Sequence, residues 1–391
     1  MMRRVGLLLC AVVLLAACDD GSHSAARTGR LVHTEHLGDI SPQILPVLLD
    51  AAGVPARLEL RYRIGIYRIR YTTVDPDDNV VEVSGAIFIP LNAPPAPVAS
   101  TQHGTQSLRE NVASVAPLIY GADALLLAAE GFVACSPDYL GLGSSTAPHP
   151  YLHADTSAAT VLDGIRAAIQ FCRERAIALD GDLFLAGYSQ GGYVTLAAQR
   201  AIEAGAPLDL TLSAVASLSG AYDLVGIVDT MLRNPADEDV VLASYFVTAY
   251  NRLYGWDRLD EIFSPRYAGH VASLFDGTRS FAAIQAALPP TVGELFNPAF
   301  VARYLRREEP AVLAAIADNA LLDWTPQTPL RLYHGSADTT VPYANAVTAL
   351  QTYQQRGAPD VALVTLEGVD HVGGISAAIG PTLEWFRSLR R

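Results

Sequence analysis

A serine stands between glycines where a short apolar run gives way to a helical pattern. The segment LFLAGYSQGGYVTLAAQR, residues 183–200, contains Gly187-Tyr188-Ser189-Gln190-Gly191-Gly192. A strand, then Gly-x-Ser-x-Gly, then a helix is typical of a nucleophile elbow, a tight turn that exposes the serine hydroxyl. The pattern predicts that Ser189 is a nucleophile, and the alternative is a structural glycine-rich turn.

A serine of this kind needs a base to take its proton. The elbow predicts the chain order serine, then an acid, then histidine. His371 is the predicted base, because it follows an apolar run and lies in GVDHVGG, which we expect to be a small flexible loop. The other downstream histidines fit less well, since His270 falls in a region without strands and His334 falls inside a strand-like run.

The base in turn needs an acid to orient it. Asp338 is the predicted acid, because LYHGSADTTVP places it just past the end of a strand. Its alternative role is that of a helix-capping or turn aspartate. Asp370 and Glu367 are the other candidate acids, but Asp370 adjoins His371, and sequence neighbours rarely pair ring to carboxylate.

Two backbone amides should bind the oxyanion that forms when a serine attacks a carbonyl. One is the amide of Gln190, which follows the nucleophile. The other is expected from STQHGTQSL, where His103-Gly104 allows a sharp turn and the Thr105 amide can face the serine. The Thr105 side chain would add a third bond, and His103 is expected to be structural.

The surrounding pattern predicts the fold class. Short apolar runs alternate with helical stretches after Pro90, which favours an α/β fold with a mostly parallel central sheet and helices on both faces. The region at about 221–328 lacks strands and predicts a helical cap insertion, with helices at 240–253, 279–288 and 298–317. The other predicted helices are 113–129, 155–175, 190–204, 343–357 and 375–390. Two alternating segments, 57–75 and 80–90, predict an antiparallel start to the sheet.

The N-terminus resembles a bacterial lipoprotein signal. Arg3 and Arg4 precede an apolar run that ends in Leu15-Ala16-Ala17-Cys18, too short to span a bilayer. We expect a signal peptide over residues 1–18, lipidation of Cys18, a tether over 19–35 and a hydrolase domain over 36–391. A cleaved signal peptide with an incidental cysteine is the alternative. The expected location is the bacterial cell envelope, lipid-anchored on the periplasmic face or secreted.

Two cysteines remain in the domain, Cys135 and Cys172. Both lie in apolar runs, which favours buried free thiols, although a bridge between them stays open. The net charge of −13 and the absence of a basic cluster exclude the usual nucleic-acid-binding face. No metal-ligand spacing occurs, so we expect neither metal nor cofactor.

These residues together resemble the α/β-hydrolase superfamily. The resemblance rests on His103-Gly104-Thr105, SPDYLGLG at 136–143, the elbow, Asp338 and His371, and spans residues 58–391. Within the superfamily the chain is similar to the secreted lipases of the Candida antarctica lipase A type. The resemblance implies a carboxylic ester hydrolase (esterase or lipase), no cofactor, a cap after the sixth strand and an ester or lipid substrate. A serine peptidase on the same fold and a non-catalytic binding lipoprotein of the envelope are the alternatives.

Overall fold

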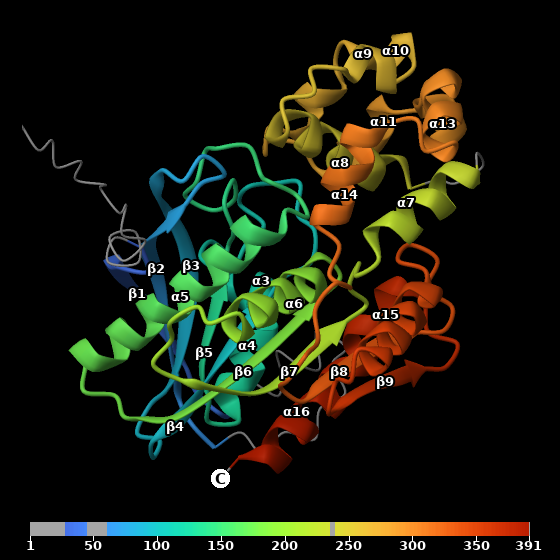
Figure 1. The fold of residues 1–391 in the computed structure, drawn as a ribbon. Helices are drawn as coiled ribbons and strands as arrows, with labels where there is room; N and C mark the ends of the chain where they lie inside the picture. The colour runs from blue at the N-terminus through green and yellow to red at the C-terminus, as the bar shows by residue number, and fades with distance from the viewer. Residues whose placement is uncertain (1–27, 45–60, 235–238, 391) are drawn as a thin grey trace, which may run out of the picture.

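The computed structural model describes residues 28–44, 61–234 and 239–390, and its strands form one nine-stranded sheet (Figure 1). The strand order is β1-β2-β3-β5-β4-β6-β7-β8-β9. The strands are β1 (Leu31–Ile40), β2 (Ile64–Val74), β3 (Val80–Pro90), β4 (Ala96–Gln102), β5 (Val133–Pro137), β6 (Leu179–Tyr188), β7 (Thr211–Leu218), β8 (Leu330–Gly335) and β9 (Val361–Leu366). Pairing is antiparallel from β1 through β2 and β3 to β5, and parallel from β5 through β4, β6, β7 and β8 to β9. The predicted, mostly parallel α/β sheet is confirmed.

Helices cover both faces of this sheet. They are α3 (Pro117–Tyr120), α4 (Ala122–Ala129), α5 (Ala154–Glu174), α6 (Gln190–Glu203), α15 (Tyr343–Gln355) and α16 (His371–Leu389). Helices α5, α6 and α15 bury one apolar cluster, and α4 and α16 bury the other. In the second cluster the Phe184 ring of β6 lies 5.4 Å from Phe132 and 5.0 Å from Phe386, measured between centroids. The central strands are therefore apolar on both sides, as a parallel sheet requires.

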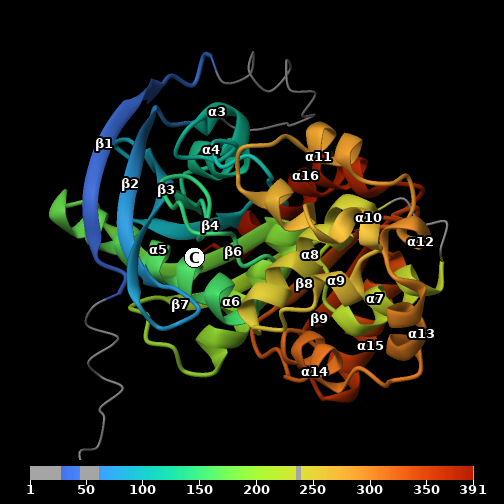
Figure 2. The ribbon, with the colours of Figure 1, turned by 90° about the horizontal axis from the view of Figure 1, so that it is seen from above.

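The described residues between β7 and β8 form helices joined by loops and add no strand to the sheet, as the lack of a strand pattern predicts. These are α7 (Leu224–Arg233), α8 (Val240–Leu253), α9 (Leu259–Ile262), α10 (Pro265–Ala268), η1 (Val271–Phe275), α11 (Phe281–Ala287), α12 (Val292–Leu295), α13 (Pro298–Leu305) and α14 (Pro310–Asp318). We call them the helical insertion. They gather at one end of the sheet, and Figure 2 looks down on them.

Two expectations about the N-terminal part of the domain need correction. Residues 31–35, expected in the tether, belong to β1, which pairs with β2 from Leu31 to Ile40. An edge strand pairs along one side and here stays largely exposed, so its sequence carries little apolar signal. Strand β2 begins at Ile64, later than expected, and residues 45–60 lie outside the described part of the chain. So do residues 1–27, which hold the signal peptide and Cys18.

Two predicted helices are each divided in two, and prolines mark where helices begin. The stretch 113–129 starts as a helix only at Pro117, in the first turn of α3, and divides at Gly121 into α3 and α4. The stretch 298–317 becomes α13 and α14, since Pro310 likewise begins a helix. Proline lacks a backbone N–H, so it is tolerated at the start of a helix and disfavoured inside one.

Candidate active site

Ser189 stands on a strained turn between β6 and α6. Its backbone has φ 58° and ψ −121°, a region that residues with a side chain rarely adopt. The turn is held because the Ser189 amide donates to the Leu218 carbonyl of β7 at 2.8 Å. The chain reverses from strand to helix in one residue, which leaves the hydroxyl at the carboxyl end of the sheet. Strain of this kind is common at active sites.

The flanking glycines are required by close backbone contacts. A Cβ at Gly191 would stand 1.9 Å from the carbonyl oxygen of Gln102, and a Cβ at Gly187 would stand 2.3 Å from the carbonyl oxygen of Gly191. Real Cβ atoms do not approach so closely. The pattern Gly-x-Ser-x-Gly is thus explained by packing of α6 against β4 and β6.

His371 faces the serine from the start of α16. Its Nε2 lies 2.9 Å from Ser189 Oγ. The expectation that His371 lies on a flexible loop is wrong, because it is the first residue of α16 and Asp370 caps that helix by accepting from the Gly373 amide at 2.8 Å. The Tyr188 hydroxyl also donates to the His371 carbonyl oxygen. A helix terminus positions the imidazole more firmly than a loop would.

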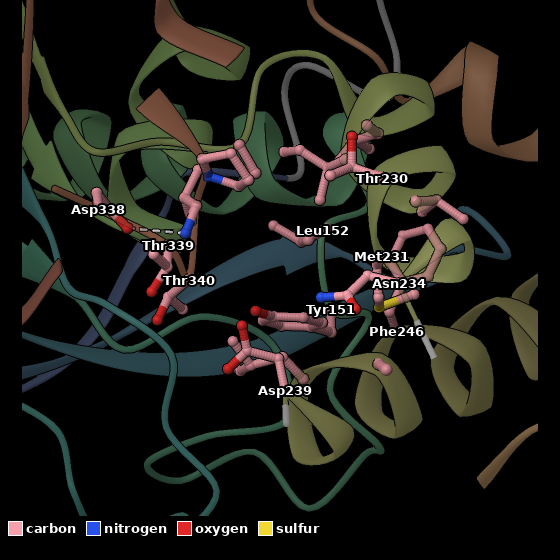
Figure 3. A pocket seen from close by; sticks show the side chains of 18 residues that line it. Tyr151, Leu152, Thr230, Met231, Asn234, Asp239, Phe246, Asp338, Thr339 and Thr340 are labelled. Carbon is pink, nitrogen blue, oxygen red and sulfur yellow. Dashed lines mark hydrogen bonds between the residues drawn. The ribbon is translucent and has the colours of Figure 1, made fainter. Parts of the chain in front are cut away.

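Asp338 holds the other side of the imidazole. The His371 Nδ1–H donates to Asp338 Oδ2 at 2.7 Å, and the Val341 amide donates to Oδ1 at 2.9 Å (Figure 3 marks the second bond). His334 Nε2 lies 3.3 Å from the same Oδ2 and also donates to the Val341 carbonyl. Burial opposes ionisation of this carboxyl, but the bonds from His334 and His371 outweigh it and hold the pKa of Asp338 well below its usual range. Asp338 is therefore a carboxylate whenever the protein is near neutral pH.

The rival residues occupy other positions. Glu367 accepts from Ser336 Oγ at 3.2 Å on the surface. His270 caps η1 and is exposed. His334 is wholly buried in β8 and contacts the carboxylate of Asp338. Its involvement was missed from the sequence, although the four-residue separation in HGSAD is a signal that places the two side chains at one strand end.

Gln190 follows Ser189 in the chain, and Thr105 belongs to a loop that lies against the nucleophile. Gln190 is the first residue of α6, and a Cβ at Gly104 would stand 3.6 Å from the Ser189 Cβ, so the loop at 103–105 lies against the nucleophile. In the described part of the chain neither the Gln190 amide nor the Thr105 amide donates a hydrogen bond. The Thr105 hydroxyl lies 2.9 Å from the Tyr151 hydroxyl. Two free amides beside a hydroxyl at a helix N-terminus suit a developing negative charge.

Two other residues of the sequence pattern have structural contacts. The Nδ1 atom of His103 lies 2.7 Å from the Gly104 carbonyl oxygen, and its Nε2 atom lies 3.1 Å from the Asp138 carbonyl oxygen. Asp138 is fully buried and accepts from Ser84 Oγ at 2.6 Å and from the Ser114 amide at 3.2 Å. Both residues tie the loops around the elbow together, as expected for His103.

A cavity of about 330 Å³ opens between the helical insertion and the residues that follow Asp338 (Figure 3). Its polar edge includes Thr339 and Thr340, and Tyr151 stands on its wall. Most of its lining is apolar, and seven of the apolar residues come from α7 and α8: Leu224, Ile227, Val228, Met231, Leu242, Ala243 and Phe246. Asp338 lines the cavity but Ser189 and His371 do not, so the cavity reaches the acid and does not enclose the serine. An apolar substituent of a bound molecule would fit there.

The insertion aromatics mostly form core. Tyr245, Tyr250 and Phe263 are buried, and Phe246 is buried on the wall of the cavity.

The described residues contain no cluster of three or more possible metal ligands. Cys135 and Cys172 are both free and buried, and burial raises their pKa values to about 11 and about 12. Among the described helices, none is both long and apolar enough to cross a bilayer.

Comparison with known proteins agrees with this architecture. The rice cell wall degrading esterase LipA from Xanthomonas oryzae, in a ligand-bound crystal structure, matches with a TM-score of 0.84 and 28% identity over 93% of this chain and 100% of that one. The chain has an α/β-hydrolase fold. Candida antarctica lipase A in its closed state matches this α/β-hydrolase with a TM-score of 0.69 and 14% identity, over 93% of this chain and 82% of the lipase, which supports the fold alone.

The family comparison adds a function class. A model of the secretory lipase family matches residues 113–235 of this α/β-hydrolase. No curated protein sequence matches it. The family match and the similarity to LipA support an ester hydrolase and suggest a secreted protein.

Proposed function

We propose that this α/β-hydrolase cleaves carboxylic esters through Ser189, His371 and Asp338 and an acyl-enzyme. The observation that carries the proposal is the continuous chain of contacts from Ser189 Oγ to His371 Nε2 at 2.9 Å and from His371 Nδ1 to Asp338 Oδ2 at 2.7 Å. Nucleophile, base and orienting acid are thus within hydrogen-bond reach without rearrangement.

The reaction follows from these positions. Ser189 Oγ attacks the ester carbonyl carbon while its proton passes to His371 Nε2, and the Asp338 carboxylate stabilises the imidazolium. The Gln190 and Thr105 amides bind the tetrahedral oxyanion, and loss of one such donor costs roughly 3–4 kcal/mol in the barrier. His371 then protonates the departing alcohol, and a water molecule repeats the cycle on the acyl-enzyme to release the acid.

The cavity beside Asp338 is the proposed site for the apolar part of the ester. Seven of its lining side chains, all from α7 and α8, are apolar, and the family match is to lipases. Carboxylesterase and lipase are therefore favoured over peptidase. We also propose that the enzyme is held at the bacterial envelope by lipid on Cys18, or secreted.

Hydrolysis of p-nitrophenyl esters from acetate to palmitate tests the proposal. The wild-type chain should turn over part of this series, and Ser189→Ala should lose at least about 10³-fold in kcat with its fold intact by circular dichroism. An equally active Ser189→Ala variant would contradict the proposal. If the wild type cleaves a peptide and no ester, the peptidase alternative is correct, and if it cleaves neither, the binding alternative is.

A further inference from the structure

One short segment contacts the side chains of both residues whose amides are proposed to bind the oxyanion. His149 Nε2 lies 2.7 Å from the side-chain nitrogen of Gln190, and the Tyr151 hydroxyl lies 2.9 Å from Thr105 Oγ1. Both contacting residues are more than nine-tenths buried. We propose that His149 and Tyr151 are positioning residues that fix the oxyanion-binding amides, an inference that rests on the proposed function.

The hydrogen bonds of His149 determine which nitrogen accepts. Its Nδ1 lies 2.7 Å from the Leu140 carbonyl oxygen, and only a protonated nitrogen can donate there. Nε2 of the neutral ring is then an acceptor, and it takes a hydrogen from the Gln190 side-chain amide. Burial lowers the pKa of His149 to about 4, so the ring stays neutral at physiological pH. The first residue of α6 is thereby tied to a second loop.

Tyr151 is held by aromatic packing. Its ring stacks on Tyr245 of α8 with centroids 4.6 Å apart, and Tyr245 stacks on Phe275 at 4.5 Å. Burial raises the pKa of Tyr151 to about 12, which keeps the phenol protonated. The hydroxyl that meets Thr105 therefore stands at the end of a rigid stack rather than on a free side chain.

The segment is also anchored at its next residue. Leu152 has φ 54°, and its carbonyl oxygen accepts from the Tyr193 hydroxyl of α6 and from the Tyr250 hydroxyl of α8, both at 2.8 Å. Residues 149–152, which we call the HPYL brace, thus connect the nucleophile helix, the helical insertion and the 103–105 loop. A small displacement of a loop that supplies an oxyanion donor is enough to weaken catalysis.

Loosening the brace should weaken binding of the oxyanion more than binding of the ground-state ester. We therefore expect a fall in kcat with little change in KM. Removal of one neutral hydrogen bond corresponds to a loss of about 5- to 10-fold. Affinity for a trifluoromethyl ketone, whose serine adduct carries an oxyanion, should fall by the same factor.

A double-mutant comparison tests whether Tyr151 acts through Thr105. Tyr151→Phe and Thr105→Val each remove one partner of the same bond, so the double variant should lose about as much as either single variant. Tyr353→Phe is the matched control, because this buried tyrosine donates to the Leu321 carbonyl away from the site. It should lower the melting temperature like Tyr151→Phe while leaving kcat and ketone affinity unchanged.

A pair of variants separates the two bonds of His149. His149→Asn keeps a donor for Leu140 and removes the acceptor for Gln190, whereas His149→Gln places an oxygen near the former Nε2. The asparagine variant should lose about 10-fold in kcat, and the glutamine variant should recover part of that loss.

The outcomes test the positioning role of the HPYL brace separately from the proposed ester hydrolysis. If the wild type hydrolyses esters and Tyr151→Phe keeps its kcat and ketone affinity, the brace is refuted and the proposed function stands. Multiplying losses in the double variant would refute action through Thr105. If the wild type hydrolyses no ester and does not bind the ketone, both are refuted.

Discussion

Replacement of Asp338 by asparagine changes the group that accepts the hydrogen bond from His371 Nδ1. The carboxylate receives three N–H donors, from His371 and His334 on Oδ2 and from the Val341 amide on Oδ1. Asparagine has the same shape but only one acceptor oxygen. If that oxygen faces the histidines, its NH₂ group meets the Val341 amide, donor against donor.

The opposite orientation disturbs the base instead. The NH₂ group then faces His371 Nδ1, which must give up its hydrogen to accept, so the hydrogen moves to Nε2. A protonated Nε2 cannot take the proton of Ser189. Loss of the productive tautomer in serine hydrolases costs about 10⁴-fold in kcat, or about 5.4 kcal/mol. The unpaired donor costs roughly 1–3 kcal/mol in the free energy of unfolding.

The pH dependence of that stability difference has a defined sign. The folded-state pKa of Asp338 lies below its ordinary value, so its contribution is present above pH ~4, the unfolded-state value, and is lost as pH falls through the folded-state value. Urea unfolding of wild type and Asp338→Asn should therefore differ most near neutral pH, and the difference should shrink in acid.

The assay is kcat on a p-nitrophenyl ester, and Glu367→Gln is the matched control. Glu367 is the rival acid, undergoes the same carboxylate-to-amide change, and bonds only to the exposed Ser336 hydroxyl among the described side chains. It should keep wild-type kcat. A kcat for Asp338→Asn within 10-fold of wild type, or a larger loss for Glu367→Gln, would refute the reasoning.

Three further predictions concern the cavity, the thiols and the elbow. Met231→Trp, which fills the cavity, should lower the ratio of long-chain to acetate ester hydrolysis about 10-fold; an unchanged chain-length profile would place the acyl group elsewhere. The two thiols of residues 19–391 should resist Ellman's reagent at pH 8 until urea unfolds the protein, because their raised pKa values keep them protonated; rapid titration would contradict their burial. Gly191→Ala should lower the free energy of unfolding by about 1–3 kcal/mol, because its Cβ overlaps a backbone oxygen. A Cβ at Gly380 would meet nothing within 4 Å, so Gly380→Ala is the comparison. Equal melting temperatures for the two variants would refute the packing argument.

Local patterns made the elbow predictable from sequence. An apolar strand, a glycine-flanked serine and an amphipathic helix are adjacent in the chain, so Ser189 and its surroundings depend on few distant contacts. Asp338 could be placed because parallel strands deliver their following residues to one edge of the sheet. The helices at 240–253 and 190–203 have nearly the predicted bounds for the same local reason.

Features that depend on distant contacts were not predictable. His149 and Gln190 are 41 residues apart in the sequence, and no periodic pattern predicts their contact. Strand β1 is stabilised by its partner β2 rather than by its own apolar residues, so its polar sequence resembled a tether. His371 appeared to belong to a loop because two glycines follow Val372, whereas the cap at Asp370 and packing against the sheet extend α16 back to it.

The most direct measurement is peptide mass mapping after reaction with a fluorophosphonate, with and without a competing p-nitrophenyl ester. The account predicts one adduct, on Ser189 within the peptide at residues 183–200, that forms more slowly when the ester is present and is absent from Asp338→Asn over the same time. A fluorophosphonate adduct on another residue would contradict the account. So would a labelling rate of Ser189 that neither the ester nor the Asp338→Asn substitution changes.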